Sequence, residues 1–370
     1  MRIVIVADTW EPEVNGVVRT IRATRDELAK LGHEVTLIEP SQFRHVRCPL
    51  YPDIRLAWGI RPEVIADAVR PPCAVHITTE GPIGHAFSAY CVRRGIPFTT
   101  CYHTNFPEYL KKYAHIPQFL SFAFLRRFHH RASLMLTATP TLEAKLRKHG
   151  FTTPMARWSR GVDLQLFHPR PKHRLDKPVA LYVGRVAKEK NIEAFLQSRT
   201  DCHKWIVGEG PHLPYLQKKH PSAKYWGCLR GEELATVYAQ ADVFVFPSRT
   251  DTFGMVMIEA LASGVPVAAY PVEGPVDVVP NGQGVGHLCD NLDEAIREAL
   301  STGSAAACRQ LALRYNWPAC TQQFLDGLLV HKRERGGSSI RRRNAAPADP
   351  TVSRDAQRSA GLSRSAARRG

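Results

Sequence analysis

Two carboxylates, Asp251 and Glu259, lie eight residues apart where a buried strand gives way to a helix. The apolar run at 243–247 predicts the strand, and the helix is expected to begin near Phe253 and Gly254. The first amides of a helix lack intrahelical partners and can bind an anion, and carboxylates accept hydrogen bonds from vicinal diols. The pattern favours a site for a sugar joined to a phosphate, although a helix cap at Asp251 and a surface glutamate at 259 also fit it.

Two basic residues, Arg185 and Lys190, follow the strand predicted at 179–183 and therefore lie in the loop at its carboxyl end. Two fixed cations there could clamp a diphosphate and neutralise it as a leaving group. Since the sequence contains no evident cluster of metal ligands, these cations would take the place of a metal. A solvated charged loop is the alternative interpretation.

Three loops in the first half of the chain carry further polar candidates. Asn15 and Gly16 lie between the first strand and a helix, where a residue without a Cβ would let a phosphate approach the backbone. The G-x-G-x-x-G fingerprint is absent, which argues against a dehydrogenase. His103 follows a strand and could hydrogen-bond to a sugar or steady charge at a reacting carbon, or serve the fold alone. The other candidates on these loops are Glu80, Thr104 and Asn105.

These loops must be positioned by strands, and short apolar runs alternate with helical patterns along the chain. Such alternation predicts parallel sheets wound with helices. The expected strands lie at 2–7, 33–38, 74–78, 97–101, 134–137, 179–183, 204–207, 243–246 and 265–269. Because ligands in such sheets bind beyond the carboxyl ends of the strands, the candidate loops should line a common cleft.

The pattern restarts after a segment rich in proline and charge, which predicts an α/β fold with two Rossmann-like domains whose parallel sheets face a central cleft. The expected parts are an N-terminal domain, a linker, a C-terminal domain, a final helix and a disordered basic tail, at 1–168, 169–178, 179–315, 316–331 and 332–370. The tail has almost no large apolar residues and so cannot bury a core.

The chain carries a formal charge of +16, and the 11 basic and 3 acidic residues of 332–370 account for half of it. A moderately basic body suits an anionic ligand or an anionic membrane surface. The nine cysteines include no C-x-x-C pair, which indicates reduced thiols in the cytosol. No signal peptide and no apolar run of about 18–20 residues is evident, so a cytoplasmic or peripheral protein is expected.

A possible membrane contact lies at 109–131, where aromatic and basic residues interleave. Such a helix can lie on an anionic bilayer, with its rings in the interface and its cations at the headgroups. A core helix with a charged outer face is the alternative. Nucleic acid is not an expected partner, because no predicted sheet face carries stacked aromatic residues together with basic ones.

Together these segments resemble the retaining glycosyltransferases of family four, which have the GT-B fold, from residue 1 to about 331. The segment 251–259 is similar to the family's E-x7-E element, and 159–163 to the segment that re-enters the cleft. The family's diphosphate clamp, glycine loop and active-site histidine are matched by Arg185, Lys190, Gly16 and His103.

The resemblance implies that the N-terminal domain binds the acceptor and the C-terminal domain binds the sugar-nucleotide donor. It implies transfer with retention, without a metal or other cofactor, and catalytic roles for His103, Asp251, Arg185 and Lys190. The implied donor-binding residues are Gly16, Arg160, Arg185, Lys190, Asp251, Phe253, Gly254, Met255, Val256 and Glu259. The implied acceptor-side residues are Asn15, Glu80, Thr104 and Asn105.

The chain departs from the family at three positions, with Asp251 for the usual glutamate, Asn15 for a glycine and Arg160 for an asparagine. The combination looks most like GDP-mannose-dependent α-mannosyltransferases and sulfoquinovosyl-diacylglycerol synthases. A hexose, best matched by mannose from GDP-mannose, would then pass to a lipid or glycolipid at the inner face of the cytoplasmic membrane. The alternatives are a UDP-sugar-dependent diacylglycerol glycosyltransferase (sulfoquinovosyl or glucosyl), a sugar-nucleotide 2-epimerase and a non-catalytic nucleotide-sugar binding protein.

Overall fold

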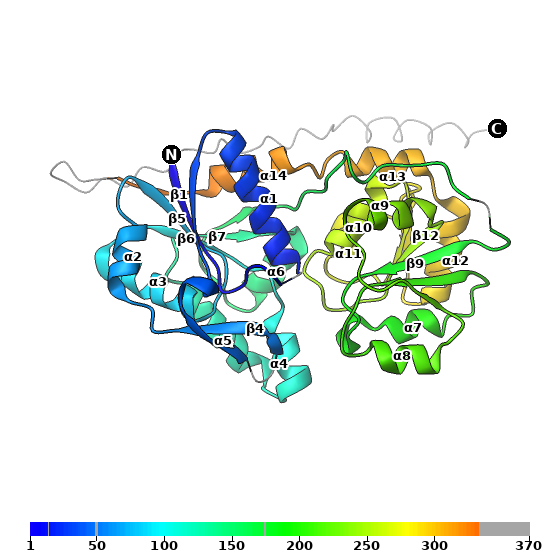
Figure 1. The fold of residues 1–370 in the computed structure, drawn as a ribbon, viewed down its shortest axis with the longest axis horizontal. Coiled ribbons are helices and arrows are strands. Elements are labelled where there is room, and N and C mark those ends of the chain that lie inside the picture. The colour runs from blue at the N-terminus through cyan, green and yellow to red at the C-terminus, as the bar shows by residue number, and fades with distance from the viewer. Residues whose placement is uncertain (14, 49–50, 174, 333–370) are drawn as a thin grey trace, which may run out of the picture.

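The computed structural model describes residues 1–13, 15–48, 51–173 and 175–332, so nearly all of the predicted tail lies outside it. Two α/β units lie side by side, each built on its own largely parallel sheet (Figure 1). This arrangement confirms the predicted fold class of two Rossmann-like domains.

The first sheet has the order β2-β1-β5-β6-β7-β8, and all of these strands run parallel. They are β1 (Arg2–Val6), β2 (Glu34–Ile38), β5 (Cys73–Ile77), β6 (Phe98–Cys101), β7 (Leu134–Thr137) and β8 (Met155–Arg157). The helices of this half are α1 (Gly16–Lys30), α2 (Pro62–Ala68), α3 (Pro82–Arg94), α4 (Phe106–Ala114), α5 (Gln118–His129) and α6 (Pro140–Lys148). A separate antiparallel hairpin joins β3 (Arg44–Cys48) to β4 (Tyr51–Trp58).

The second sheet has the order β11-β10-β9-β12-β13-β14 and is also parallel. Its strands are β9 (Val179–Val183), β10 (His203–Val207), β11 (Lys224–Tyr225), β12 (Val243–Phe246), β13 (Val267–Ala269) and β14 (Gly286–Leu288). Its helices are α7 (Ile192–Leu196), α8 (Leu213–Lys219), α9 (Gly231–Gln240), α10 (Met255–Ala262), α11 (Pro275–Val278), α12 (Leu292–Thr302) and α13 (Ala305–Ala312).

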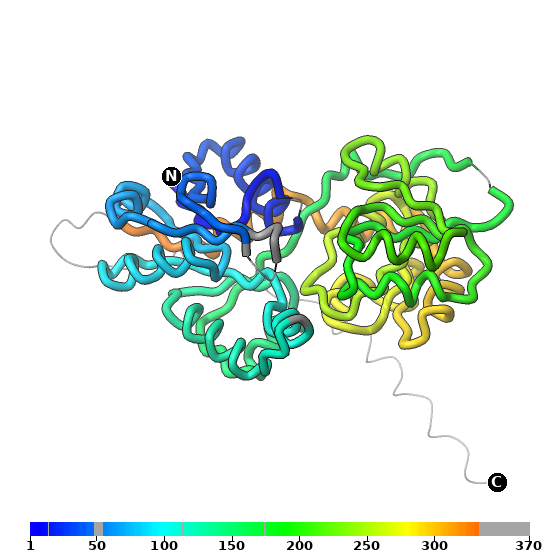
Figure 2. Tube along the Cα trace, turned by 60° about the horizontal axis from the view of Figure 1, so that its bottom comes forward, coloured from blue at the N-terminus to red at the C-terminus, as the bar shows by residue number. Residues whose placement is uncertain are grey.

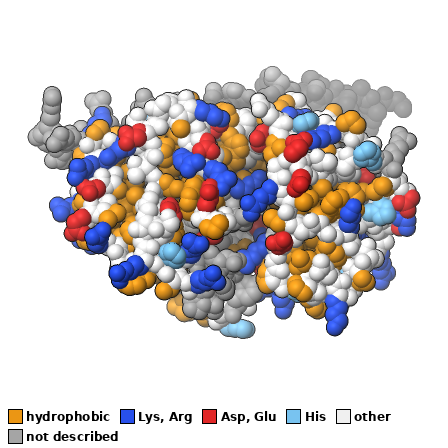
Figure 3. Space-filling model, viewed as in Figure 1, with side chains coloured by type: hydrophobic (Ala, Val, Ile, Leu, Met, Phe, Trp, Pro, Cys, Tyr) orange, Lys and Arg blue, Asp and Glu red, His pale blue; other side chains and the backbone are white. Residues whose placement is uncertain are grey.

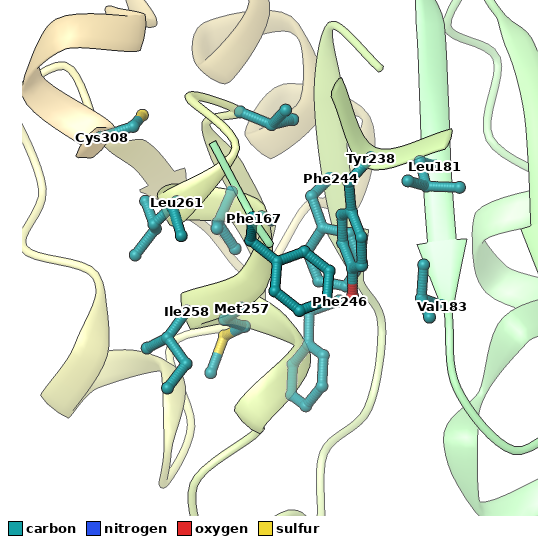
Figure 4. Close-up of a cluster of buried hydrophobic side chains, with 14 of the residues drawn as sticks. Phe167, Leu181, Val183, Tyr238, Phe244, Phe246, Met257, Ile258, Leu261 and Cys308 are labelled. Atoms are coloured by element: carbon teal, nitrogen blue, oxygen red, sulfur yellow. The ribbon is translucent and has the colours of Figure 1, made fainter. Parts of the chain in front are cut away.

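The central strands are continuous apolar runs because helices cover both faces of each sheet. In the second domain Tyr238 of α9 packs against Phe244 of β12 and Phe167, with ring centroids 5.8 and 5.6 Å away (Figure 4). Met257 and Ile258 of α10 belong to the same buried cluster. This packing fixes α10 on the sheet, and α10 carries several of the candidate residues.

The last helix, α14 (Trp317–Gly327), returns to the first domain and packs beside α1 (Figures 1 and 2). Its Phe324 lies 4.8 Å from the ring of Trp158 and is fully buried. The outgoing and returning segments are hydrogen-bonded to each other, because Val162 N donates to the Tyr315 carbonyl at 2.8 Å.

The helix predicted at 316–331 is too long. The backbone becomes extended at Leu328, and β15 (Val330–His331) pairs antiparallel with β5. The strand predicted at 265–269 begins later, at Val267, since Val265 N still donates to the Ala260 carbonyl at the end of α10. Differences of one or two residues at the other element ends are ordinary.

Candidate functional site

Loops at the carboxyl ends of strands from the two sheets meet at the junction between the domains. Thr252 Oγ1 donates to the His103 carbonyl at 2.8 Å, and Asn105 Nδ2 donates to the Thr250 carbonyl at 3.1 Å. The structure therefore brings together the loops that follow β6 and β12, as the positions of their strand ends predict. Lys and Arg side chains also gather near this junction on the face shown in Figure 3.

Asp251 and Lys190 form an ion pair between the loops that follow β12 and β9. Lys190 Nζ is 2.5 Å from Asp251 Oδ1, and the 3₁₀ turn Lys188–Lys190 holds the lysine in place. Burial alone would lower the pKa of Lys190, but the carboxylate outweighs burial and raises this pKa above its ordinary value. Asp251 Oδ2 is buried and has no hydrogen-bond partner among the described residues. One oxygen of Asp251 is thus held by a cation, and the other can accept a hydrogen bond from a ligand hydroxyl.

Three more side-chain oxygens near this pair are buried without hydrogen-bond partners among the described residues. They are Ser248 Oγ, Thr250 Oγ1 and Glu273 Oε1. Buried polar atoms are nearly always hydrogen-bonded in folded proteins, so a group of such atoms on adjacent loops is typical of a polar ligand site. Together with Asp251 they suit a molecule with several hydroxyl groups.

Helix α10 starts beside Asp251, with Gly254 as its N-cap in the left-handed region (φ +82°). A Cβ at this glycine would lie 2.7 Å from Met257 Cε and 2.9 Å from Phe246 Cζ. No side chain caps the helix, so the amides of Met255 and Val256 suit an anion such as a phosphate. The Phe253 side chain is buried against Tyr315 and supports the turn.

Glu259 lies further along α10 and is almost completely buried, with 2% of its side chain exposed. Its Oε1 pairs with the guanidinium of Arg19, which comes from α1 of the other domain. Its Oε2 accepts a hydrogen bond from Tyr238 Oη at 2.9 Å. Glu259 is therefore an interior carboxylate at the domain junction, and the alternative of a surface glutamate at this position is wrong. The charge of Glu259 raises the pKa of Arg19.

Gly16 opens α1 and faces the same region of the second domain. A Cβ at Gly16 would lie 3.6 Å from Met255 Sδ, and Thr20 Oγ1 is 3.7 Å from that sulfur. The glycine loop is therefore next to the start of α10. Asn15 is the N-cap of α1, with Oδ1 accepting from Val18 N at 2.9 Å, and its Nδ2 donates to Thr9 Oγ1 at 3.0 Å. The side-chain amide of Asn15 therefore holds the loop before α1 in place.

Both ring nitrogens of His103 contact protein groups. Arg160 Nη2 is 2.7 Å from Nδ1, and Cys101 Sγ is 2.9 Å from Nε2. Since a guanidinium can only donate, Nδ1 must be the acceptor, and Nε2 then carries the proton. Burial and the charge of Arg160 lower the pKa of His103 well below its ordinary value, so the ring is neutral.

Arg160 is buried and donates to the carbonyls of Trp158 and Ser159 at 2.8 and 2.9 Å. All of these contacts are within the first domain, so Arg160 orients His103 in this structure. Arg185 lies in the loop after β9, and its carbonyl accepts from Tyr182 Oη at 2.9 Å.

The acceptor-side candidates are held in different ways. The Glu80 side chain is 6% exposed and lies beside His129, with Oε1 3.1 Å from Nε2. His129 Nδ1 is 2.9 Å from Thr100 Oγ1. Asn105 is buried and bridges the domains, whereas the Thr104 carbonyl accepts from Phe106 N at the start of α4. The structure thus brings Asn105 to the junction and places Glu80 in a buried pair with a histidine.

Sequence reasoning missed Lys145 of α6, which crosses the domain junction. Its Nζ lies 2.9 Å from Glu273, 2.7 Å from Glu108 and 3.3 Å from Asn105 Oδ1. Lys145 and Glu273 are 128 positions apart, so no local pattern links them. Arg19 was also missed, although its place one turn after the Gly16 loop is a usable signal. The described residues contain no cluster of three or more metal-ligating side chains.

Comparisons with known proteins match both halves of the chain to glycosyltransferases. Residues 14–166 match the family described as Glycosyltransferase Family 4, and residues 177–302 match Glycosyl transferases group 1. A GDP-mannose-dependent alpha-mannosyltransferase of Mycolicibacterium smegmatis is 31% identical over 88% of this chain and 96% of its own length. Sulfoquinovosyl transferase SQD2 of Arabidopsis thaliana is 30% identical over 69% of this chain and 56% of its own length.

The fold is also that of solved glycosyltransferases. Sucrose-phosphate synthase of Thermosynechococcus elongatus superposes with a TM-score of 0.67 at 21% identity, over 87% of this chain and 97% of the other. The family matches and the curated relatives show an enzyme that transfers a hexose. The chain belongs to glycosyltransferase family four and is a glycosyltransferase of the GT-B fold.

Proposed function

We propose that this enzyme transfers mannose from GDP-mannose to a lipid or glycolipid acceptor, with retention of anomeric configuration and without a metal. The observation that carries the proposal is the Lys190–Asp251 pair beside the uncapped start of α10. This places a fixed cation, free amides and an unpartnered carboxylate oxygen within one set of loops. A sugar diphosphate presents the complementary groups, because its phosphates are anionic and its sugar carries vicinal hydroxyls.

In the proposed reaction the bond between the sugar C1 and the phosphate oxygen breaks while C1 bonds to the acceptor oxygen. Lys190, Arg185 and the amides of Met255 and Val256 stabilise the charge that develops on the departing diphosphate. The leaving phosphate oxygen takes the acceptor proton on the same face of the sugar. Asp251 orients the sugar through Oδ2. Catalysis then consists of positioning and electrostatic stabilisation.

Glu259 would hold the ribose hydroxyls of the donor. Because Arg19 and Tyr238 occupy both of its oxygens, the ribose must displace at least one of them or share an oxygen. His103 and Arg160 shape the first-domain wall of this site. Their contacts leave the neutral His103 ring fixed in one orientation.

A second candidate is a UDP-sugar-dependent transferase that makes a diacylglycerol glycolipid. It is favoured by the similarity to SQD2, whose name specifies a sulfoquinovosyl transferase. Sulfoquinovose carries a sulfonate, which needs a cation that mannose does not require. The two candidates therefore differ in donor and predict different products from the same site.

The proposed lipid acceptor requires contact with a membrane, and α5 supplies a suitable surface. Phe119, Leu120 and Phe124 are 70, 51 and 55% exposed, while Phe122 and Leu125 on the opposite face are buried. The helix therefore packs on the core with one face and presents apolar side chains on the other. Among the described residues, no helix has the length and apolar character needed to cross a bilayer. We infer peripheral binding at the inner face of the cytoplasmic membrane.

The donor is tested with purified protein by thermal shift against GDP-mannose, UDP-glucose and UDP-sulfoquinovose. GDP-mannose alone should raise the melting temperature, and EDTA should not change the rate of transfer. A shift with UDP-sulfoquinovose alone would favour the second candidate. Release of an epimerised sugar nucleotide without acceptor would indicate an epimerase, and no shift with any sugar nucleotide would refute the proposal.

The membrane contact is tested by sedimentation with anionic and neutral vesicles. Binding should favour anionic vesicles and weaken with salt, because Debye screening shortens the range of surface charges. Equal recovery with both vesicle types would argue against it.

A further inference from the structure

The first domain contains a hollow of about 540 Å³ that none of the proposed donor or acceptor residues lines. Its lining residues come from the end of α5, the turn that follows it and the segment before β8. They are Ala123, Arg126, Arg127, His130, Arg131, Gly150 and Thr152. Three arginines and a histidine line this Arg pocket, and none of its lining residues is acidic. Its volume is in the range of sites for small organic ligands.

One wall of the Arg pocket is fixed by packing and hydrogen bonds. Arg126 Nη1 donates to the His149 carbonyl at 3.1 Å, and the His149 ring stacks on buried Phe122 at 3.7 Å. A Cβ at Gly150 would lie 3.1 Å from Arg126 Nη1, so the guanidinium passes closely over the backbone there. His130 Nδ1 is 3.5 Å from Thr152 Oγ1 on the facing segment. The pocket is therefore a shaped feature of the folded domain.

Within the described part of the chain, Arg126, Arg127 and Arg131 form no ion pair with a carboxylate. The charge of Arg131 affects a neighbouring histidine. Burial is the larger cause of the lowered pKa of His85, and the charge of Arg131 lowers this pKa further. Several guanidinium groups around one hollow create a positive potential that attracts an anion. Guanidinium forks match the oxygens of a phosphate, which they can bind through two parallel hydrogen bonds.

We propose that the Arg pocket binds the phosphate group of a phosphate ester, held by Arg127 and Arg131. The ester can be a phospholipid headgroup or a soluble phosphorylated molecule. A headgroup suits this site because the exposed apolar residues Phe119, Leu120 and Phe124 of α5 precede the arginines in the chain. Apolar side chains beside cations match the acyl chains and the phosphates of a bilayer surface. The site does not depend on which sugar nucleotide is the donor.

The Arg pocket is separate from the donor site. Arg131 lies just before β7 and Thr152 just before β8, so the pocket is near the amino ends of these strands. The donor-site loops follow the carboxyl ends of β6, β9 and β12. A phosphate ester in the pocket and a sugar nucleotide at the domain junction can therefore bind at the same time.

The test compares the full chain with two double variants that remove equal charge. One is Arg127→Gln with Arg131→Gln, and the control is Arg93→Gln with Arg94→Gln at the exposed end of α3. Binding is measured by calorimetry with inorganic phosphate and glycerol phosphate, and by sedimentation with phosphatidylcholine vesicles with and without phosphatidylglycerol. The melting temperature of each variant verifies that it is folded.

The pocket variant should bind at least one of these probes about tenfold more weakly than wild type, with little change in the control. Loss of vesicle binding identifies a lipid headgroup as the source of the phosphate, and loss of soluble phosphate binding alone identifies a soluble ester. Equal loss in both variants would show diffuse surface attraction and overturn the proposal. Unchanged binding of every probe by the pocket variant would also overturn the proposal. Failure of all sugar nucleotides to bind would refute the proposed function without affecting this comparison.

Discussion

Arg19 and Glu259 form an ion pair across the domain junction, and 240 positions of sequence separate them. Glu259 is also the carboxylate that would hold the donor ribose. The same carboxylate thus joins α1 to α10 in the structure and forms part of the proposed nucleotide site. If the proposal holds, the ribose hydroxyls and the Arg19 guanidinium compete for the oxygens of Glu259.

Removal of Arg19 should consequently strengthen nucleotide binding. We expect Arg19→Ala to lower the Kd for the nucleoside diphosphate about three- to tenfold, as for the loss of one competing charge-assisted hydrogen bond. Arg22→Ala is the matched control, because Arg22 lies on the same helix and pairs with Glu11 at the surface. Calorimetric titration measures both variants. Weaker binding by Arg19→Ala would place Arg19 among the groups that hold the donor.

Lys190→Ala should impair the chemical step. The substitution removes the cation that we propose stabilises the departing diphosphate, and it leaves Asp251 without its partner. Loss of one such group costs about 10²–10³ in kcat. Lys188→Ala removes an exposed charge from the same turn and should keep activity within about twofold. Steady-state transfer assays compare the two, and equal rates would remove Lys190 from the catalytic machinery.

Gly254→Ala should destabilise the protein at the turn before α10. The added Cβ meets Met257 and Phe246 in a left-handed backbone, so we expect a loss of about 2–4 kcal/mol in the free energy of unfolding. Gly282→Ala has a similar φ (+75°) and open space around the added Cβ, so it should cost only about 1–2 kcal/mol. Urea denaturation separates steric overlap from backbone strain, and equal losses would show that overlap contributes nothing.

Stability should decrease on acidification because of His76. Burial, and then the charge of Arg160, lower its pKa to about 3, so the unfolded chain binds this proton more readily below about pH 6.5. The neutral His76 therefore makes its full contribution to the free energy of unfolding above about pH 6.5. As the pH falls towards the folded-state pKa, this contribution decreases by up to about 1.4 kcal/mol per pH unit. Urea unfolding should show a shallower pH slope for His76→Gln than for the exposed control His173→Gln. The same slope in both variants would contradict the assignment.

Much of the fold follows from local sequence patterns. Each strand predicted from an apolar run is present, because strands covered on both faces must be apolar throughout. The β3–β4 hairpin was not predicted, since charged residues such as Arg44 and Arg47 interrupt any clean alternation. Short β8, β11 and β14 were also missed, because two or three residues carry no recognisable period.

The sequence predicted the proximity of candidate residues that lie on loops at strand ends. The approach of Lys190 to Asp251 agrees with loops expected to share one edge of a sheet. The contacts of His103 with Arg160 and Cys101 could not be predicted, since they depend on how a later loop folds back. The ion pair of Lys145 with Glu273 joins residues on different domains, and only tertiary structure brings them together.

The return of α14 to the first domain has a consequence for biosynthesis. The N-terminal half emerges from the ribosome before Phe324 and Leu328 are synthesised. Until then Trp158 and Ile5 of the nascent domain stay incompletely buried. The first domain therefore completes its core only after the second domain has been synthesised, and a fragment cut at the first connection would expose this surface to aggregation. The paired segments at Val162 and Asn316 also act as a two-stranded hinge, which limits how the domains can swing apart.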